Sequence, residues 1–243
     1  VYLPFVEPLL ELYPRAKAID LGCGRGEWLE LITEAGFIAH GIDLDDHMLS
    51  VCHELGLSVA IENANEALEK LPDDSLTIVS GFHIAEHIPF HDLQKIVQEA
   101  LRVLKPAGLL ILETPNSENI VVGTTNFYLD PTHQRPIPPK LLSFLPEYYG
   151  FYRTKVLRLQ ESLALVEKQC PTLMEVFGGV SPDCSIVAQK NGDKEKMLNF
   201  TTFKKEYGLT LEMLSSQYDQ QVPKLLEASK AESLERYQQV QTL

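Results

Sequence analysis

Residues 20–26 read DLGCGRG, an acid followed by three glycines at alternate positions. Residues 16–21 form a short apolar run, and residues 27–35 carry apolar side chains at helical spacing. This pattern predicts a strand, a glycine turn and a helix. Glycines at such a turn let the backbone approach a ligand and leave unpaired amides at the start of the helix. The loop therefore predicts a ligand site, although a glycine turn that only packs the helix on the strand has the same pattern.

The same alternation continues along the chain and predicts an α/β fold. Further strands are expected at residues 38–44, 58–61, 76–81, 108–113, 155–159 and 185–189. Further helices are expected at residues 46–55, 65–71, 90–103 and 161–169. Strands that alternate with helices form a parallel sheet covered on both faces. The last two strands are expected to close this sheet as a hairpin-like pair, which gives seven strands in all.

Two regions differ in composition. Residues 1–190 hold the alternating elements and form one predicted domain, whereas residues 191–243 are rich in Gln, Glu, Lys and Ser. Apolar residues of the second region follow an irregular heptad pattern that Pro223 interrupts. The pattern predicts a helical tail but does not secure a full coiled coil. We expect the tail to form a homo-oligomer or to link to a further module.

Composition limits the partner and the compartment. The formal net charge of −13 disfavours nucleic acid, because phosphate binding draws on clustered Lys and Arg. No window reaches the roughly 18 apolar residues of a membrane-spanning helix, and the first residues do not read as a signal peptide. Cys23, Cys52, Cys170 and Cys184 lack CxxC spacing, which disfavours a disulfide framework and a structural zinc site. We expect a cytoplasmic protein.

Two acids at the ends of the first two predicted strands select the ligand chemistry. A dinucleotide loop reads G-x-G-x-x-G, but Glu27 stands at the third glycine position. Asp20 would repel a pyrophosphate and attract an ammonium group, so it suits a zwitterionic ligand whose carboxylate meets the glycine amides. Asp43 ends the second strand, where a carboxylate accepts both hydroxyls of a ribose. The glycine loop and the two acids favour an amino-acid nucleoside over a dinucleotide.

The DLGCGRG loop and residues 41–43 (GID) resemble the class I S-adenosylmethionine-dependent methyltransferases, over about residues 16–190. The resemblance implies a Rossmann-like fold, with S-adenosyl-L-methionine as methyl donor and S-adenosyl-L-homocysteine as product. It implies cofactor contacts from Asp20, Gly22, Cys23, Gly24, Gly26, Asp43, Leu44, Asn63, Ala64 and Phe82. The acid that the family usually places against the adenine is absent, since Asn63-Ala64 stands after the third strand.

A histidine cluster follows the fourth predicted strand. His83-x-x-Glu86-His87 matches an inverted zinc-protease motif, which requires both imidazoles on one helix face. At a strand end beside a cofactor, that interpretation is disfavoured. The Glu86-His87 pair resembles one that lies near the methyl donor in many class I methyltransferases, so His87 is a candidate site residue. His83 is expected to bond to backbone and to shape the loop.

The fifth strand, residues 108–113, ends at Glu113, and the proline-rich run NFYLDPTHQRPIPP follows at residues 126–139. Ligands of open parallel sheets bind beyond the carboxyl ends of the strands, so this run is expected to be a rigid loop that walls the acceptor pocket. A hydroxyl acceptor is a weak acid that needs a base. The candidate bases are His133, Asp130 and His87. Acceptor contacts are expected from Glu113, Asn116, Asn126, Tyr128 and Arg135.

Two other interpretations of this run stay open. Residues 130–133 (DPTH) have the pattern of a capped turn, in which the acid bonds to backbone. The second interpretation is a divalent metal held by Asp130 with His83, His87 or His133. The spacing of these residues does not support it, and we predict no metal site.

Residues 113–145 resemble, more narrowly, methyltransferase domains encoded with bacterial surface-polysaccharide enzymes, including those that modify O-antigen sugars. This resemblance implies O-methylation of a sugar hydroxyl or terminal group in lipopolysaccharide biosynthesis, with peripheral contact to a glycan-assembly complex at the inner face of the membrane. One alternative acceptor is a quinone-type small molecule, for which an enclosed apolar pocket is expected. The other alternative is a non-catalytic binding or scaffold module whose main part is the tail.

Overall fold

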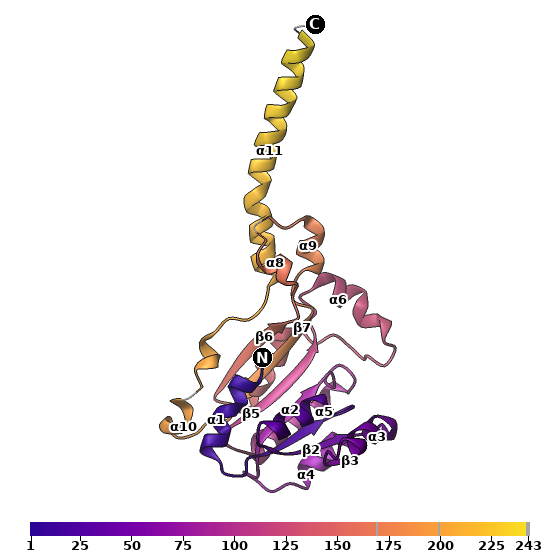
Figure 1. Ribbon diagram of the computed structural model, residues 1–243, viewed down its shortest axis with the longest axis vertical. Helices are drawn as coiled ribbons and strands as arrows, with labels where there is room; N and C mark the ends of the chain where they lie inside the picture. Colours follow the sequence, from indigo (N-terminus) through magenta and orange to yellow (C-terminus); the bar gives the residue numbers. More distant parts are fainter. Residues whose placement is uncertain (169, 199, 242–243) are drawn as a thin grey trace.

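The computed structural model describes residues 1–168, 170–198 and 200–241, which contain one seven-stranded sheet (Figure 1). The strands are β1 (Lys17–Leu21), β2 (Ile38–Asp43), β3 (Val59–Ile61), β4 (Leu76–Phe82), β5 (Leu104–Pro115), β6 (Arg153–Leu159) and β7 (Asp183–Gln189). Their order in the sheet is β3-β2-β1-β4-β5-β7-β6. β7 is antiparallel to β5 and to β6, and the other neighbours are parallel. The predicted mostly parallel sheet with a final antiparallel pair is confirmed.

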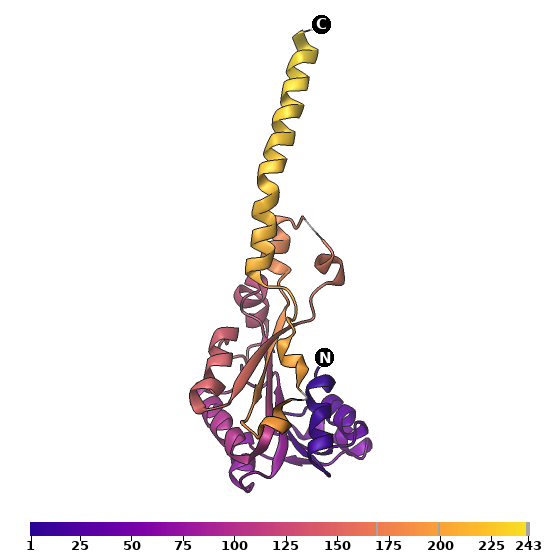
Figure 2. The same ribbon diagram turned by 90° about the vertical axis from the view of Figure 1, so that its left-hand side faces the viewer.

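Helices cover both faces of the sheet (Figures 1 and 2). The α-helices are α1 (Leu3–Leu12), α2 (Glu27–Glu34), α3 (Asp46–Glu54), α4 (Ala64–Glu69), α5 (Phe90–Val103), α6 (Ile120–Thr124), α7 (Pro139–Tyr149), α8 (Leu163–Val166), α9 (Leu173–Gly178), α10 (Lys194–Leu198) and α11 (Leu211–Gln241). Two short 3-10 helices are η1 (Asn126–Leu129) and η2 (Thr201–Lys204). In α5 the buried residues Leu93, Ile96, Val97, Ala100 and Val103 repeat every three or four positions, so one face of the helix packs on the sheet.

The carboxyl ends of the central strands form one edge, where the sheet can hold a ligand. Asp20 of β1 pairs with Ser80 of β4, and Phe82 of β4 pairs with Glu113 of β5. β6 ends and β7 begins at the same edge, because Asp183 pairs with both Pro115 and Leu159. The topology therefore brings side chains from β1, β4, β5, β6 and β7 together.

The run 126–139 differs from the continuous rigid loop expected from its prolines. Its first residues form η1, and its last residue, Pro139, begins α7. Proline is favoured at the first helical position because its missing N–H would be unpaired there. α7 ends at Gly150, whose φ of 105° is left-handed. The expected loop is therefore confined to the residues between Asp130 and Pro138.

β5 also begins earlier than predicted. Leu104 already pairs with Leu76 of β4, and the register then shifts before Leu109 pairs with Ile78. Ala107 has a φ of 65° within this irregular stretch. The helix predicted over residues 90–103 ends where expected, but the chain pairs with β4 at once rather than passing through a turn.

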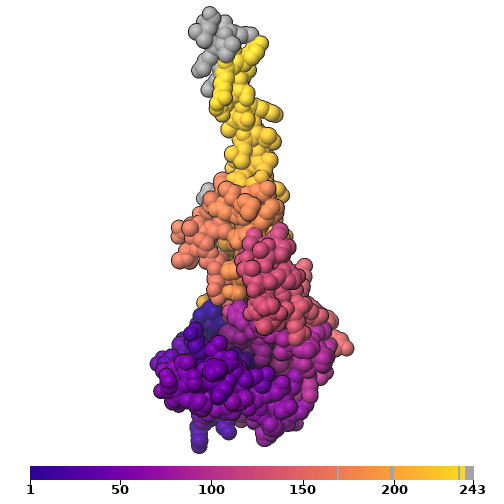
Figure 3. Space-filling view, turned by 90° about the vertical axis from the view of Figure 1, so that its right-hand side faces the viewer, coloured from indigo at the N-terminus to yellow at the C-terminus, as the bar shows by residue number. Residues whose placement is uncertain are grey.

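The region after β7 contributes to the main core before it leaves it. Phe200 is buried beside α1, and Phe203 and Tyr207 pack against the same cluster, with the ring of Phe203 5.3 Å from that of Phe5. The expected helical tail is α11, whose first turns pack beside α9 and whose C-terminal part projects from the body (Figure 3). Four residues of the expected helical stretches lie outside the described residues: Gln169, Asn199, Thr242 and Leu243. None of the helices in the described ranges combines the length and apolar character that crossing a membrane requires.

Candidate active site

Asp20 is a buried carboxyl group at the end of β1. Ser80 on the neighbouring strand donates its hydroxyl to Oδ1 of Asp20 at 2.7 Å, and the indole of Trp28 donates to Ser80 Oγ at 3.0 Å. The pKa of Asp20 is raised to about 7, mainly by burial, with the hydrogen bond from Ser80 lowering it and the charge of Asp43 raising it. A cation placed beside Asp20 would offset this desolvation. The carboxyl group therefore suits the ammonium group of a zwitterionic ligand.

The glycine loop after Asp20 has the conformation that only glycine adopts without strain. Gly24 has a φ of 54°, and a Cβ placed there would point into open space, so its backbone is accessible. Gly26 has a φ of 85°, and a Cβ there would lie 2.6 Å from Leu57 and 2.9 Å from Cys52. The first glycine leaves room for a ligand, and the second lets α2 pack closely. Cys23 is buried, with its amide bonded to the carbonyl of Ile42 at 2.9 Å.

Asp43 lies at the end of β2, where the adjoining backbone holds its carboxylate. Oδ2 accepts from the amide of Gly24 and Oδ1 from the amide of Asp45, both at 2.9 Å. Leu44 follows and is 70% exposed, an apolar surface suited to the face of a base. Asn63 instead uses its side chain to cap α4, accepting from the amides of Asn65 and Glu66. Its contribution to a nucleoside is therefore limited to backbone and neighbouring surface.

Two cavities flank the glycine loop and share Gly22. The first, of about 410 Å³, is lined by Asp20, Trp28 and Phe82 together with the loop. The second, of about 310 Å³, is lined by Asp43, Leu44, Asn63, Ala64 and His87, among others. An acid at each end and glycine backbone in the middle fit a ligand with an amino-acid part and a nucleoside part.

His83 lies at the end of β4 between two carboxylates. Its Nδ1 is 3.1 Å from Glu86 Oε1, and its Nε2 is 3.5 Å from Glu113 Oε1. Glu86 also accepts from Thr114 Oγ1 at 2.9 Å, and Glu113 accepts from the hydroxyl of Tyr2. The prediction that the ring of His83 bonds to backbone is wrong, because the ring bonds to the side chains of Glu86 and Glu113. Glu113 and then Glu86 raise the pKa of His83 to about 10, so it is a cation at neutral pH and not a base.

His87, four residues further on, has a different set of hydrogen-bond partners. Its Nδ1 is 3.0 Å from Thr132 Oγ1, which is 2.6 Å from Asp130 Oδ1. A carboxylate only accepts, so Thr132 donates to Asp130 and accepts from Nδ1–H of His87. This order leaves the lone pair on Nε2 of His87, a residue that lines the 310 Å³ cavity. Bonds from the hydroxyl and amide of Thr132 hold the pKa of Asp130 below its usual range, so Asp130 stays charged.

His133 lies against His87 rather than against the two cavities beside the glycine loop. Its Nδ1 is 2.7 Å from the carbonyl oxygen of Phe127, so Nδ1 donates there. Its Nε2 is 3.8 Å from Asp130 Oδ2, and its ring is 4.7 Å from that of His87. The Asx-type bond from the amide of Thr132 to Asp130, at 2.8 Å, also makes the turn that the DPTH pattern indicated. Asp130 and His133 are thus brought to His87, which faces the cavity.

Comparison with known proteins gives the family. Residues 19–112 match a family model described as a methyltransferase domain. A probable S-adenosylmethionine-dependent methyltransferase of Mycolicibacterium smegmatis is 32% identical over 133 residues, 55% of this chain and 51% of that protein. A ubiquinone biosynthesis O-methyltransferase of Methylococcus capsulatus is 35% identical over 105 residues, 41% of this chain and 44% of that protein. The chain thus spans about half the length of the curated relatives it matches.

A solved structure extends the similarity over a larger part of the chain. The S-adenosylmethionine-dependent methyltransferase of Archaeoglobus fulgidus is similar with a TM-score of 0.66 and 28% identity, over 76% of this chain and 93% of that one. Residues 19–112 are therefore a methyltransferase domain, similar to methyltransferases that use S-adenosylmethionine. The glycine loop, Asp20 and Asp43 would hold S-adenosylmethionine, which supplies the methyl group when bound, and the two cavities share Gly22.

The predicted acceptor contacts of the methyltransferase are spread over several environments. Asn116 is buried, donating to the carbonyl of Ser181 at 2.8 Å and accepting from the amide of Glu118 at 3.0 Å, so its side chain fixes the chain after β5. Asn126 and Tyr128 are exposed on η1. The guanidinium of Arg135 lies 4.1 Å from the ring centre of Phe90. Among the predicted contacts, Glu113 lies closest to the histidine cluster.

Among the residues that the structure describes, two groups of side chains bring three possible metal ligands within 4.8 Å. One is Glu86, His87 and His133, and the other is His83, Glu113 and Asp183. Asp130 belongs to neither group, so the set considered from the sequence is not the one that the fold assembles. In the second group the imidazolium of His83 already lies between Glu86 and Glu113.

Several residues of the methyltransferase site were not predicted. Trp28, Ile84 and Ile88 line the cofactor cavities, and Thr132 orients His87. The isoleucines flank the Glu86-His87 pair in the sequence, and this position could have been used to predict that they line the site. Tyr2 had none, because its bond to Glu113 joins residues 111 positions apart.

Proposed function

We propose that this chain is an O-methyltransferase that transfers the methyl group of S-adenosylmethionine to a sugar hydroxyl of a bacterial surface glycan, such as an O-antigen polysaccharide. Bound S-adenosylmethionine supplies an electrophilic methyl group on a positively charged sulfur. The residues of the chain hold the two reactants in line and receive the proton of the hydroxyl.

The hydrogen-bonded row His87, Thr132 and Asp130 carries this proposal. A sugar hydroxyl is too weak an acid to lose its proton unaided, so a base at the transferred methyl group accelerates its attack. His87 Nε2 takes the proton, while Nδ1–H stays bonded to Thr132 Oγ1. Asp130, charged and bonded to Thr132, stabilises the imidazolium that forms. A binding module has no need of such an oriented base.

The polar lining of the acceptor side supports a sugar. Tyr2, Glu113, Gln160 and Glu161 line the cavity of about 400 Å³ next to β5. Side chains of this kind hydrogen-bond to several hydroxyls at once. The resemblance of residues 113–145 to domains that modify surface polysaccharides agrees with this choice.

A quinone-type phenol is the second candidate, because a ubiquinone biosynthesis O-methyltransferase is 35% identical over 105 residues. That acceptor is apolar over most of its surface and calls for an apolar enclosure. The ionisable residues beside Glu113 favour the sugar instead.

The test is a transfer assay read by mass spectrometry. Purified protein and S-adenosylmethionine are incubated with defined oligosaccharides, with phenolic quinone precursors, and with neither. We expect the mass of one methyl group to be added to an oligosaccharide only. Methylation of the phenols alone would replace the sugar by the second candidate. Failure to bind S-adenosylhomocysteine in calorimetry would refute the proposed methyltransferase activity.

A further inference from the structure

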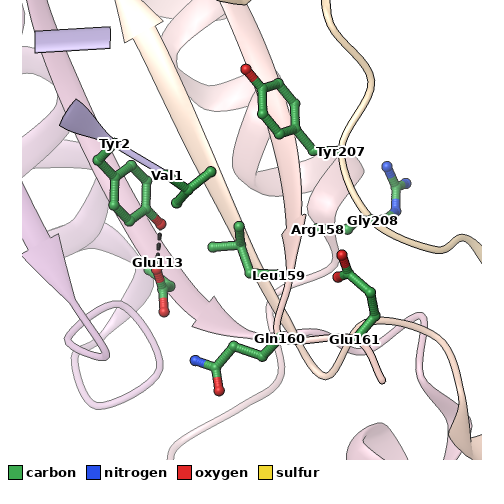
Figure 4. A pocket seen from close by; sticks show the side chains of 9 residues that line it. All are labelled: Val1, Tyr2, Glu113, Arg158, Leu159, Gln160, Glu161, Tyr207 and Gly208. Atoms are coloured by element: carbon green, nitrogen blue, oxygen red, sulfur yellow. Dashed lines mark hydrogen bonds between the residues drawn. The ribbon is translucent and has the colours of Figure 1, made fainter. Parts of the chain in front are cut away.

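A third cavity, of about 400 Å³, lies beside the acidic end of β5 (Figure 4). Tyr2 and Glu113 form one wall, and the chain just after β6 forms the floor with Gln160 and Glu161. Tyr207 and Gly208, from the segment before α11, form the opposite wall. Four distant parts of the chain therefore meet here, and one of them belongs to the region expected to be a separate tail.

Tyr2 separates this cavity from the cofactor. Its ring lies 5.3 Å from that of Phe82 and 5.8 Å from that of Trp28, and both line the 410 Å³ cavity beside Asp20. Its hydroxyl bonds to Glu113, which lines the third cavity. A molecule in the third cavity is thus one side chain away from the methyl donor.

Two backbone features show that the walls are held in a fixed shape. Gly208 has a φ of 67°, and a Cβ there would lie 2.4 Å from the carbonyl of Arg158 and 2.4 Å from Ser181 Oγ. Only glycine fits at position 208, so the segment around Tyr207 packs directly against the end of β6. Gln160, which lines the cavity, has a φ of 65°, which costs energy for a residue with a Cβ.

The charges of the lining select the ligand. Glu113 and Glu161 contribute two carboxylates. The guanidinium of Arg158 is already paired with Glu118, with Nε to Oε2 at 2.6 Å and Nη2 to Oε1 at 3.0 Å. Glu113 is already paired with the imidazolium of His83, so it is the carboxylate of Glu161, which accepts from Ser181 Oγ at 2.7 Å, that repels phosphates and uronic acids. Carboxylates and the Gln160 amide bond to hydroxyls, and the tyrosine rings cover apolar ring faces.

We propose that this cavity is a subsite for a neutral sugar ring of the acceptor, adjacent to the sugar that is methylated. The inference rests on the proposed function and adds to it that the acceptor is an oligosaccharide without acidic groups at this ring. It also makes the segment around Tyr207 part of the site and not a linker.

Saturation-transfer NMR tests the subsite apart from turnover. The probes are neutral hexose disaccharides and the matching disaccharides that contain a uronic acid, each added to the protein with S-adenosylhomocysteine. We expect signals from neutral probes and none from the acidic ones. Gln160→Gly keeps the backbone angle and removes the side chain, and it should weaken neutral binding by about fivefold, the loss of one hydrogen bond. Gln160→Lys should admit the uronic acid probes.

The matched control is Gln220→Ala, an exposed glutamine on α11, which should bind the probes like the parent protein. The inference is overturned if no neutral probe binds, if acidic probes bind the parent equally well, or if Gln160→Gly changes nothing. Neutral sugar binding without methyl transfer would keep the subsite and remove the proposed function. Methyl transfer to a sugar at the same rate in the parent and in both Gln160 variants would keep the proposed function and remove the subsite.

Discussion

The cofactor side of the site, at Asp20 and the glycine loop, and the acceptor side, at Glu86 and Glu113, differ in how their carboxylates are paired. On the cofactor side, Asp20 is buried with Ser80 as its hydrogen-bond partner, and the pKa of its carboxyl group is raised to about 7. On the acceptor side, Glu86 and Glu113 flank a cation of the chain itself, His83, whose pKa is raised to about 10. The first side favours a positively charged ligand. The second is an ion cluster of His83, Glu86 and Glu113. The reactive imidazole of His87 lies beside that cluster but outside it.

The two sides also differ in how far apart in the sequence their contacting residues lie. Asp43 is held by backbone amides 2 and 19 positions away, so the cofactor side is built largely within one β-α-β unit. The acceptor side joins Tyr2 to Glu113 and Glu86 to Thr114, 111 and 28 positions apart. Binding of the methyl donor is therefore a local property of the fold, and acceptor chemistry depends on how the whole chain assembles.

The largest expected effect separates the two histidines near Asp130. His87→Gln should lower kcat by about 10² to 10⁴, the usual contribution of a general base, with S-adenosylhomocysteine affinity unchanged. His133→Gln should lower kcat by only about tenfold, because His133 acts by packing on the ring of His87, 4.7 Å away. Both are measured by methyl-transfer kinetics on the same oligosaccharide. A reversed order would make His133 the base.

The next effect belongs to the cofactor side alone. Asp43→Ala removes the carboxylate expected to receive the ribose and should weaken S-adenosylhomocysteine binding by about 100-fold, the value of charged hydrogen bonds. Titration calorimetry measures it. Asp46→Ala, an exposed acid in the first turn of α3, is the control and should bind normally. Equal affinity in Asp43→Ala would place the nucleoside elsewhere.

The same contrast explains what the sequence could predict. The strands and the mostly parallel sheet followed from alternating patterns. Asp20 and the glycines followed from one contiguous motif, and Asp43 followed from its place at the end of the second predicted strand. Tyr2, Thr132 and the Arg158–Glu118 pair could not be predicted, because their roles depend on partners far along the chain. His83 was misread for the same reason: nothing local indicated that Glu113 would face it. The prolines of residues 136–139 were read as stiffeners, although the last of them begins a helix.

A smaller effect tests the ion cluster through stability. The folded pKa of His83, about 10, lies above the 6.5 of a free histidine. Its ion pairs therefore stabilise the fold fully below about pH 6.5, and this contribution is lost as pH rises through 10. Since the side chain of His83 is 43% exposed, we expect only about 1–2 kcal/mol. Urea unfolding of the parent and of His83→Gln should converge at high pH, and a constant difference would refute the ion cluster.

The smallest effect tests whether Asp20 awaits a cation. Because burial raises the pKa of Asp20 to about 7, the carboxyl group is mostly neutral at pH 6 and mostly charged at pH 7.5. An ammonium group binds the charged form, so affinity for S-adenosylhomocysteine should rise about fivefold over this interval. Asp20→Asn should bind more weakly and lose the pH dependence, while Asp46→Ala should keep it. If the parent bound equally at both pH values, the amino group of the cofactor would lie away from Asp20, and both sides of the site would hold their charges without the ligand.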